Sequence, residues 1–143
     1  MKKLSVIVVA LFASCFAMAS FAASRTIQVT LSGCELLSTP LTFPATETDS
    51  SITENGSMNH AILSKRLETY YEIDNLKIDR STQTGTFAYI YDPATTPGET
   101  VGGMNFTYKT IVDGGRTILK LSFPYCHQGN EVCNAFAGMQ ISY

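Results

Sequence analysis

Two cysteines and a histidine in the last part of the 143-residue chain are the residues best suited to chemistry. Cys126 and Cys133 flank the hexapeptide His-Gln-Gly-Asn-Glu-Val. If Gly129-Asn130 form a two-residue hairpin turn, pairing outward from the turn places Cys126 directly opposite Cys133. A cross-strand Cα separation of about 4.5–5.5 Å is within reach of a disulfide. We therefore predict a Cys126–Cys133 disulfide that stabilises the fold by about 2 kcal/mol.

The remaining cysteines keep the connectivity open. Cys15 falls in a leader segment described below, so the expected mature chain retains three cysteines, the third being Cys34. Three cysteines allow one internal bridge, and we expect Cys34 to be a free thiol. A link from Cys34 to Cys126 or Cys133 is the alternative. The spacing of Cys126, His127 and Cys133 differs from the paired Cys and His spacings of common zinc sites. No metal or cofactor is predicted.

A disulfide is expected because the chain begins like a secretory signal peptide. Two lysines follow Met1, then an apolar run extends from Leu4 to about Met18, and a stretch of small residues comes next. Cleavage after Ala22 fits this pattern best, with a cut after Ala19 as the main alternative. We predict that residues 1–22 are a signal peptide and that 23–143 form a single β-rich domain. The product is expected in the periplasm or outside the cell, where disulfides persist.

The expected mature chain has the size of one ordinary domain and is mildly acidic. Removing 22 residues leaves 121, and the loss of Lys2 and Lys3 changes the formal net charge from −2 to about −4. A chain of this length can bury a sizeable core. No run of Lys and Arg provides an electrostatic footprint for nucleic acid. No second apolar run approaches the ~20 residues of a membrane-spanning helix, so no transmembrane segment is expected after the leader.

Apolar residues in the expected mature chain alternate with a period of two, which indicates β-strands. The apolar phase shifts near Asp74-Asn75, which predicts a bulge, and Asp113-Gly114-Gly115 predicts a hairpin turn. The expected fold is all-β, a small antiparallel β-sandwich or barrel of about 6–8 strands. The predicted strands include 26–31, 69–78, 86–91, 105–112, 117–123 and 135–143.

Three stretches lack this alternation. Residues 57–66 favour one or two turns of helix, with a strand through 60–63 as the alternative. Residues 46–56 are polar and acidic, and residues 92–103 contain two prolines and three glycines, so both are predicted loops. A solvated connector is the simpler interpretation of 92–103, yet loops on a rigid sheet often bind partners. The candidate binding residues there and on the preceding strand are Tyr89, Tyr91, Asp92, Thr95, Thr96 and Glu99.

The sequence has no catalytic signature. His60 and His127 do not belong to a His-Glu-x-x-His motif, and no Gly-x-Ser-x-Gly or phosphate-binding glycine loop is present. Cys34 precedes an acidic residue, which hinders formation of a thiolate. Most of the tyrosines suit half-buried sheet positions, and a tyrosine platform for a sugar or a partner is the alternative.

These observations favour an exported, non-catalytic binding protein whose partner is a protein or a surface polymer. An inhibitor of an enzyme belongs to the same class. The second hypothesis is a structural or fibre-forming subunit that assembles by strand exchange, with the Ile27-Val29-Leu31 strand as donor. A small exported hydrolase is the third hypothesis. A catalytic carboxylate pair can come from residues far apart in the sequence, so it leaves no local motif.

Overall fold

The structure is a computed structural model, and it describes most of the chain from residue 23 onward. The described residues form nine β-strands and one short α-helix. The described ranges are 23–37, 39–56, 60–64, 69–93, 100–127 and 129–143. The elements are β1 (Arg25–Ser32), β2 (Leu41–Glu47), β3 (Ser51–Glu54), β4 (His60–Ser64), β5 (Thr69–Asp79), β6 (Thr84–Pro93), β7 (Thr100–Asp113), β8 (Arg116–Ser122), α1 (Glu131–Phe136) and β9 (Gln140–Ser142).

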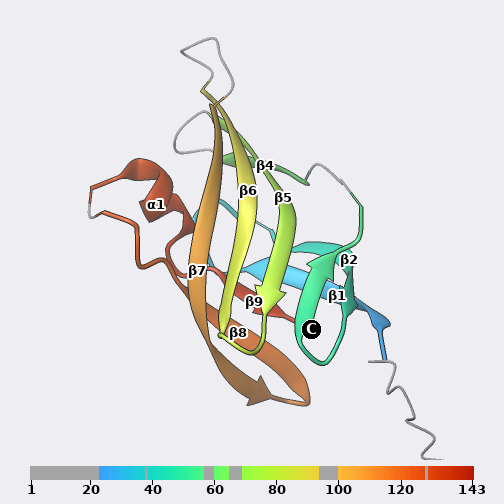
Figure 1. Cartoon of the computed structure of the whole chain (residues 1–143). Helices are drawn as coiled ribbons and strands as arrows, with labels where there is room; N and C mark the ends of the chain where they lie inside the picture. The colour runs from blue at the N-terminus through green and yellow to red at the C-terminus, as the bar shows by residue number, and fades with distance from the viewer. Residues whose placement is uncertain (1–22, 38, 57–59, 65–68, 94–99, 128) are drawn as a thin grey trace, which may run out of the picture.

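Eight of the strands close into an antiparallel barrel (Figure 1). The order around the barrel is β3-β2-β1-β9-β8-β7-β6-β5, and β5 pairs back with β3. β3 uses the Lys77–Asp79 part of β5, while β4 pairs with the Thr69–Ile73 part of the same strand. The predicted all-β class is therefore confirmed, in its barrel form.

Apolar side chains fill the interior of the barrel. Phe43 and Phe106 are among the largest strand side chains buried there, at 2% and 1% exposure. An eight-stranded barrel has an interior just wide enough for side chains to fill. The interior is thus a packed core, whose members include Val29, Leu31, Phe43, Ile52, Ile73, Ile78, Phe106, Leu119 and Ile141.

Two predicted irregularities are confirmed. The pairing of β5 with β6 shifts register between Asp74 and Lys77, at the expected bulge. Asn75 there has φ of 57°, and its backbone N–H donates to Asp74 Oδ1 at 2.8 Å. The β7–β8 hairpin closes with Asp113 opposite Arg116, and the two intervening glycines, 114 and 115, have φ of 56° and 79°. Two consecutive positive φ values are what such a two-residue turn requires.

Two expectations for the middle of the chain are wrong. Residues 60–64, within the favoured helix at 57–66, form β4, which confirms the alternative of a strand through 60–63. Pairing with β5 supplies backbone hydrogen-bond partners, whereas a helix of one or two turns is only marginally stable by itself. The expected loop at 46–56 contains the end of β2 and all of β3. Its two glutamates, Glu47 and Glu54, are buried, and tertiary partners satisfy their charges.

The end of the chain also differs from expectation. The first part of the predicted strand at 135–143 belongs to α1, and only Gln140–Ser142 is a strand. Gly138 follows the helix with φ of 81°, and a Cβ atom there would lie 2.9 Å from the carbonyl oxygen of Gly33. Glycine at this position permits both the turn and the close approach. No helix among the described residues has the length and apolar character needed to cross a membrane.

Candidate functional site: the disulfide-closed loop

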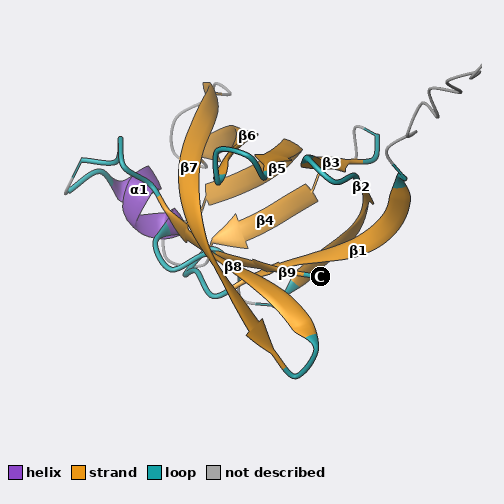
Figure 2. Cartoon of the chain, turned by 60° about the horizontal axis from the view of Figure 1, so that its bottom comes forward, coloured by secondary structure: helices purple, strands orange, loops and turns teal. Residues whose placement is uncertain are grey.

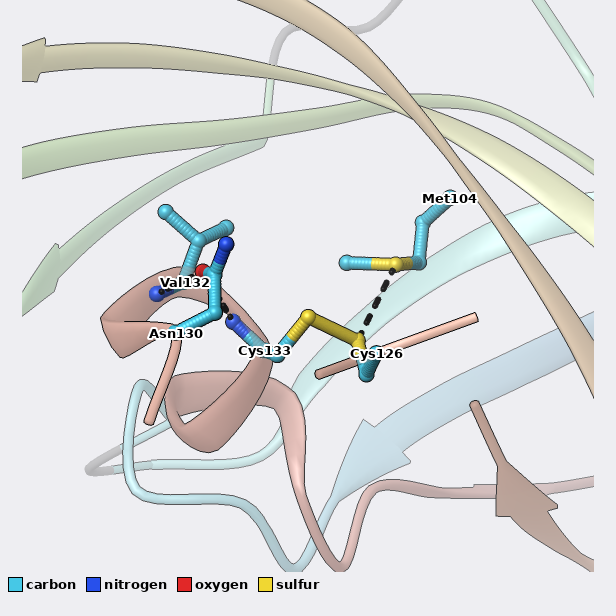
Figure 3. Close-up of a disulfide and its surroundings, with 5 residues drawn as sticks. All are labelled: Met104, Cys126, Asn130, Val132 and Cys133. Atoms are coloured by element: carbon cyan, nitrogen blue, oxygen red, sulfur yellow. Dashed lines mark hydrogen bonds between the residues drawn. A yellow bond between two sulfur atoms is a disulfide. The ribbon is translucent and has the colours of Figure 1, made fainter. Parts of the chain in front are cut away.

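Cys126 and Cys133 form a disulfide, with their Cα atoms 5.4 Å apart (Figure 3). The predicted pair is present, but the hairpin register behind the prediction is wrong. Cys133 lies in α1, so a helix rather than a second strand brings the two sulfurs together. Cys126 Sγ also lies 3.9 Å from Met104 Sδ. This is a packing contact, because a disulfide sulfur has no hydrogen to donate.

Asn130 determines where the helix begins. Its side-chain Oδ1 accepts hydrogen bonds from the backbone N–H groups of Val132 at 3.0 Å and Cys133 at 3.2 Å (Figure 3). This N-cap arrangement satisfies N–H groups that have no partner inside a helix. Gly129-Asn130 therefore starts a helix instead of turning a hairpin, and the helix carries Cys133 to its partner.

Aromatic packing fixes both ends of the segment 123–136. The ring centroid of Phe123 lies 6.2 Å from that of Phe87 and 6.3 Å from those of Phe106 and Phe136. Phe136, at the end of α1, is fully buried and lies 5.2 Å from Phe87 by the same measure. The loop between Phe123 and Phe136 is thus held by the core at each end and by the disulfide within it.

At 78% exposure, Tyr125 exceeds Val112 at 72% and Ile111 at 39%, the other large apolar side chains that are exposed among those the structure describes. It lies in a β-turn, because the backbone N–H of Cys126 donates to the carbonyl oxygen of Phe123 at 3.1 Å. Pro124 occupies the second position of this turn, where its fixed φ is favourable. Tyrosine offers a large contact area with few rotatable bonds. A conformationally restricted turn therefore presents an aromatic side chain to solvent.

A surface hollow lies beside the disulfide. Its volume is about 340 Å³, near the lower end of the range for small-molecule pockets. Cys126 and Cys133 form part of its wall, and Phe123 and Leu121 contribute apolar surface. Its polar side chains are Ser122, His127 and Asn134. The hollow can accept an apolar group flanked by hydrogen-bonding partners.

The binding residues predicted from the sequence do not gather at this loop. Tyr89 is half-buried, with its ring 5.9 Å from Phe136 between centroids, and its ring covers Gly102, where an added Cβ would lie 2.4 Å from Tyr89 Cζ. Tyr91 and Asp92 lie in β6, paired with residues of β5. The predicted loop at 92–103 is shorter than expected, since β6 extends to Pro93 and β7 begins at Thr100. Thr95, Thr96 and Glu99 lie outside the described residues.

Cys34 is the free cysteine among the described residues, and it is buried. Its side chain is 6% exposed, and burial raises the pKa of its thiol. A buried thiol with a raised pKa forms little thiolate and reacts slowly. Cys34 therefore belongs to the core, and the arrangement gives it no role as a nucleophile.

A group of ionised side chains lies elsewhere in the barrel. Glu47 is buried at the end of β2 and accepts hydrogen bonds from Arg25 and Arg80. Arg80 also donates to the carbonyl oxygen of Thr48 at 3.1 Å and to the hydroxyl of Tyr143 at 3.0 Å. Burial raises the pKa of Glu47, and the hydrogen bonds from the two guanidinium groups outweigh that effect, so its pKa is lowered overall. The network joins β1, β2, the β5–β6 turn and the chain end.

Tyr125 was not among the residues singled out from the sequence. The signal available was local: Phe-Pro-Tyr-Cys places a turn-forming proline and a potential anchor beside a cysteine. The exposure of the Tyr125 side chain is a tertiary property that this local pattern does not contain. The described residues hold no group of three or more His, Cys, Asp or Glu side chains that could bind a metal ion.

One fold can support many functions, so the function of a protein lies in the chemistry of its sites. Here the site consists of an exposed aromatic side chain, a disulfide and an adjoining hollow. Comparison with known proteins shows that no family model, no curated protein and no solved structure matches this chain.

Proposed function

We propose that this protein is an exported, non-catalytic binding domain, and that Tyr125 on the disulfide-closed loop is the anchor for a protein partner. The observation that carries the proposal is the combination of a 78% exposed tyrosine with a backbone fixed by a β-turn and a disulfide. Binding hot spots are enriched in tyrosine, and a preorganised loop loses little entropy when it binds.

The packed barrel supports surface binding. Apolar side chains occupy the interior, so a ligand approaches the outside of the barrel. Export to an oxidising compartment is part of the same proposal, since it suits the Cys126–Cys133 disulfide and the expected leader at 1–22, which lies outside the described residues. An inhibitor that binds an enzyme through this loop falls within the proposal.

A protein is the favoured partner because of the shape and chemistry of the site. The hollow beside the disulfide is small, and its polar groups are the neutral side chains Ser122 and Asn134 with His127. Tyr125 directly precedes Cys126, which lines this hollow, and projecting anchors and pockets are paired across protein interfaces. A surface polymer is the competing outcome of the experiment.

Site-specific photocrosslinking in the exporting cell tests this proposal. A photoreactive phenylalanine analogue is introduced at Tyr125 or, as the matched control, at Thr107, which is exposed on the wall of the barrel. We expect a discrete adduct with a different protein from position 125 and no adduct with a different protein from position 107. Identical adducts from both positions, or no adduct from 125, would refute the site. An adduct whose added mass survives protease digestion and is removed by glycan hydrolases would refute the protein partner.

A further inference from the structure

β7 extends beyond the end of β6, its neighbour on one side. Its pairing with β6 ends at Thr84 opposite Thr107, and the last backbone hydrogen bond on that side runs from Tyr108 N–H to Gln83 O at 3.1 Å. Residues 109–113 continue only as partners of β8. Both views show the β7–β8 hairpin projecting past the rest of the barrel (Figures 1 and 2). This segment, Lys109–Asp113, is termed the open edge.

The backbone polarity of the open edge follows from the alternation of an antiparallel ladder. Tyr108 directs its N–H toward β6, so Thr110 and Val112, two and four residues further on, direct their N–H and C=O groups to the same side. Within the described part of the chain, these groups make no backbone hydrogen bond on that side. The open edge therefore offers two donors and two acceptors to another strand.

The side chains of the open edge are exposed. Ile111 is 39% exposed and Val112 is 72% exposed, and the remaining three residues are also exposed. An exposed strand edge with β-branched apolar residues is a template for pairing with another chain. A lysine at one end and an aspartate at the other mark the limits of this template.

We propose that a second copy of this chain pairs with the open edge, antiparallel and about a two-fold axis at Ile111. In this register Thr110 and Val112 of each copy exchange backbone hydrogen bonds, which gives four in total. Lys109 faces Asp113 of the second copy twice, and the two Ile111 side chains meet at the axis. The ladder geometry brings such non-hydrogen-bonded pairs closest together, with Cα atoms about 4.5 Å apart.

Charge complementarity selects the second copy and this register. Centring the pairing on Lys109 or on Asp113 places like charges opposite each other, and centring it on Thr110 or Val112 places a charged side chain opposite isoleucine. Only the register centred on Ile111 places opposite charges against each other at both ends and Ile111 against Ile111. Opposite charges across strands are favourable and like charges are not.

The dimer is expected to be weak and closed. Five residues from each chain form a small contact, which is typical of transient association at concentrations on the order of 100 µM. An isologous contact uses the same edge on both copies, so it ends at two and does not form a fibre. α1 lies away from the hairpin turn in both views (Figures 1 and 2), so pairing leaves the disulfide-closed loop free. The inference does not depend on the proposed function.

Sedimentation equilibrium over a concentration series tests the proposal with two charge variants. Lys109→Asp places Asp opposite Asp, and Asp113→Lys places Lys opposite Lys, so each variant alone should be monomeric at concentrations where the native protein dimerises. Mixing the two variants restores opposite charges at both positions and should restore the dimer. Circular dichroism verifies that each variant is folded.

Thr110→Pro is the second variant, and it removes a backbone donor from the open edge without affecting a bond to β8. It should abolish dimerisation with the β-structure preserved. A native protein that remains monomeric up to about 1 mM would overturn the proposal. A dimer that persists in the single charge variants, or a mixture that does not associate, would likewise overturn it.

Discussion

Gly85 and Phe106 share one position in the interior of the barrel. The two residues face each other across β6 and β7, and a Cβ atom added to Gly85 would lie 2.2 Å from Phe106 Cζ and 2.7 Å from the carbonyl oxygen of Lys77. The absent side chain of Gly85 therefore provides the space that the Phe106 ring occupies. Phe106 is 1% exposed, so its ring has no route to solvent without disturbing the core.

Gly85→Ala should destabilise the fold by about 1–3 kcal/mol, because overpacking a core forces side chains and backbone to shift. Gly103→Ala is the matched control, since it also lies in the β6–β7 ladder and a Cβ atom there would meet nothing within 4 Å. Denaturant titration measures both variants. Equal stability of the two variants would contradict the described packing of Phe106.

Glu47 is predicted to make the protein sensitive to acid. The pKa of Glu47 is lowered in the folded protein, so its ionised form stabilises the fold. This stability is fully present above the ordinary pKa of a glutamate, about 4.3, and is lost as the pH falls through the lower pKa of the folded state. Glu47→Gln should reduce the unfolding free energy at pH 7 by about 1–3 kcal/mol and flatten its decline below pH 4. Unfolding titrations across this pH range measure the effect.

The control for Glu47→Gln is Asp49→Asn, an exposed neighbour of the same cluster. We expect it to leave the unfolding free energy at pH 7 within about 0.5 kcal/mol of the native value. An equal loss of unfolding free energy in the two variants would show that the hydrogen bonds from Arg25 and Arg80 make Glu47 no more stabilising than Asp49.

The cysteines should differ in reactivity. Peptide mapping of the non-reduced protein should give one linked peptide pair, Cys126 with Cys133, and one peptide with unlinked Cys34. Cys34 should be alkylated slowly in the folded protein and rapidly in denaturant, because burial both shields its thiol and raises its pKa. A cross-link involving Cys34, or fast alkylation of the native protein, would contradict the structure.

The sequence predicts strands well where one face is apolar and the other polar. Val29 and Leu31 in β1 and Leu119 and Leu121 in β8 alternate with polar residues, and all four are buried. β2 and β3 were missed because Pro44, Glu47 and Glu54 interrupt this pattern. The partners of the two glutamates include Arg80 and the backbone of Leu76, far along the chain, and such tertiary contacts are not visible in a local pattern.

The candidate site was only partly predictable. The disulfide was predicted for the wrong geometric reason, because Asn130 suits both a hairpin turn and a helix cap. The packing of Phe136 against Phe87, Tyr89 and Phe123 favours the helix, and these contacts are tertiary. The exposure of Tyr125 is a property of the folded surface, and the local sequence Phe-Pro-Tyr-Cys predicts only the turn that carries it.

The most direct measurement of the central claim is the affinity of Tyr125→Ala for the partner captured by crosslinking at position 125. Calorimetry with the purified pair should show binding roughly 30-fold weaker than that of the native protein, the equivalent of a hot spot of about 2 kcal/mol. Thr107→Ala, on the exposed wall of the barrel, should bind within about two-fold of native. Native affinity in Tyr125→Ala would contradict the claim that this loop is the binding site.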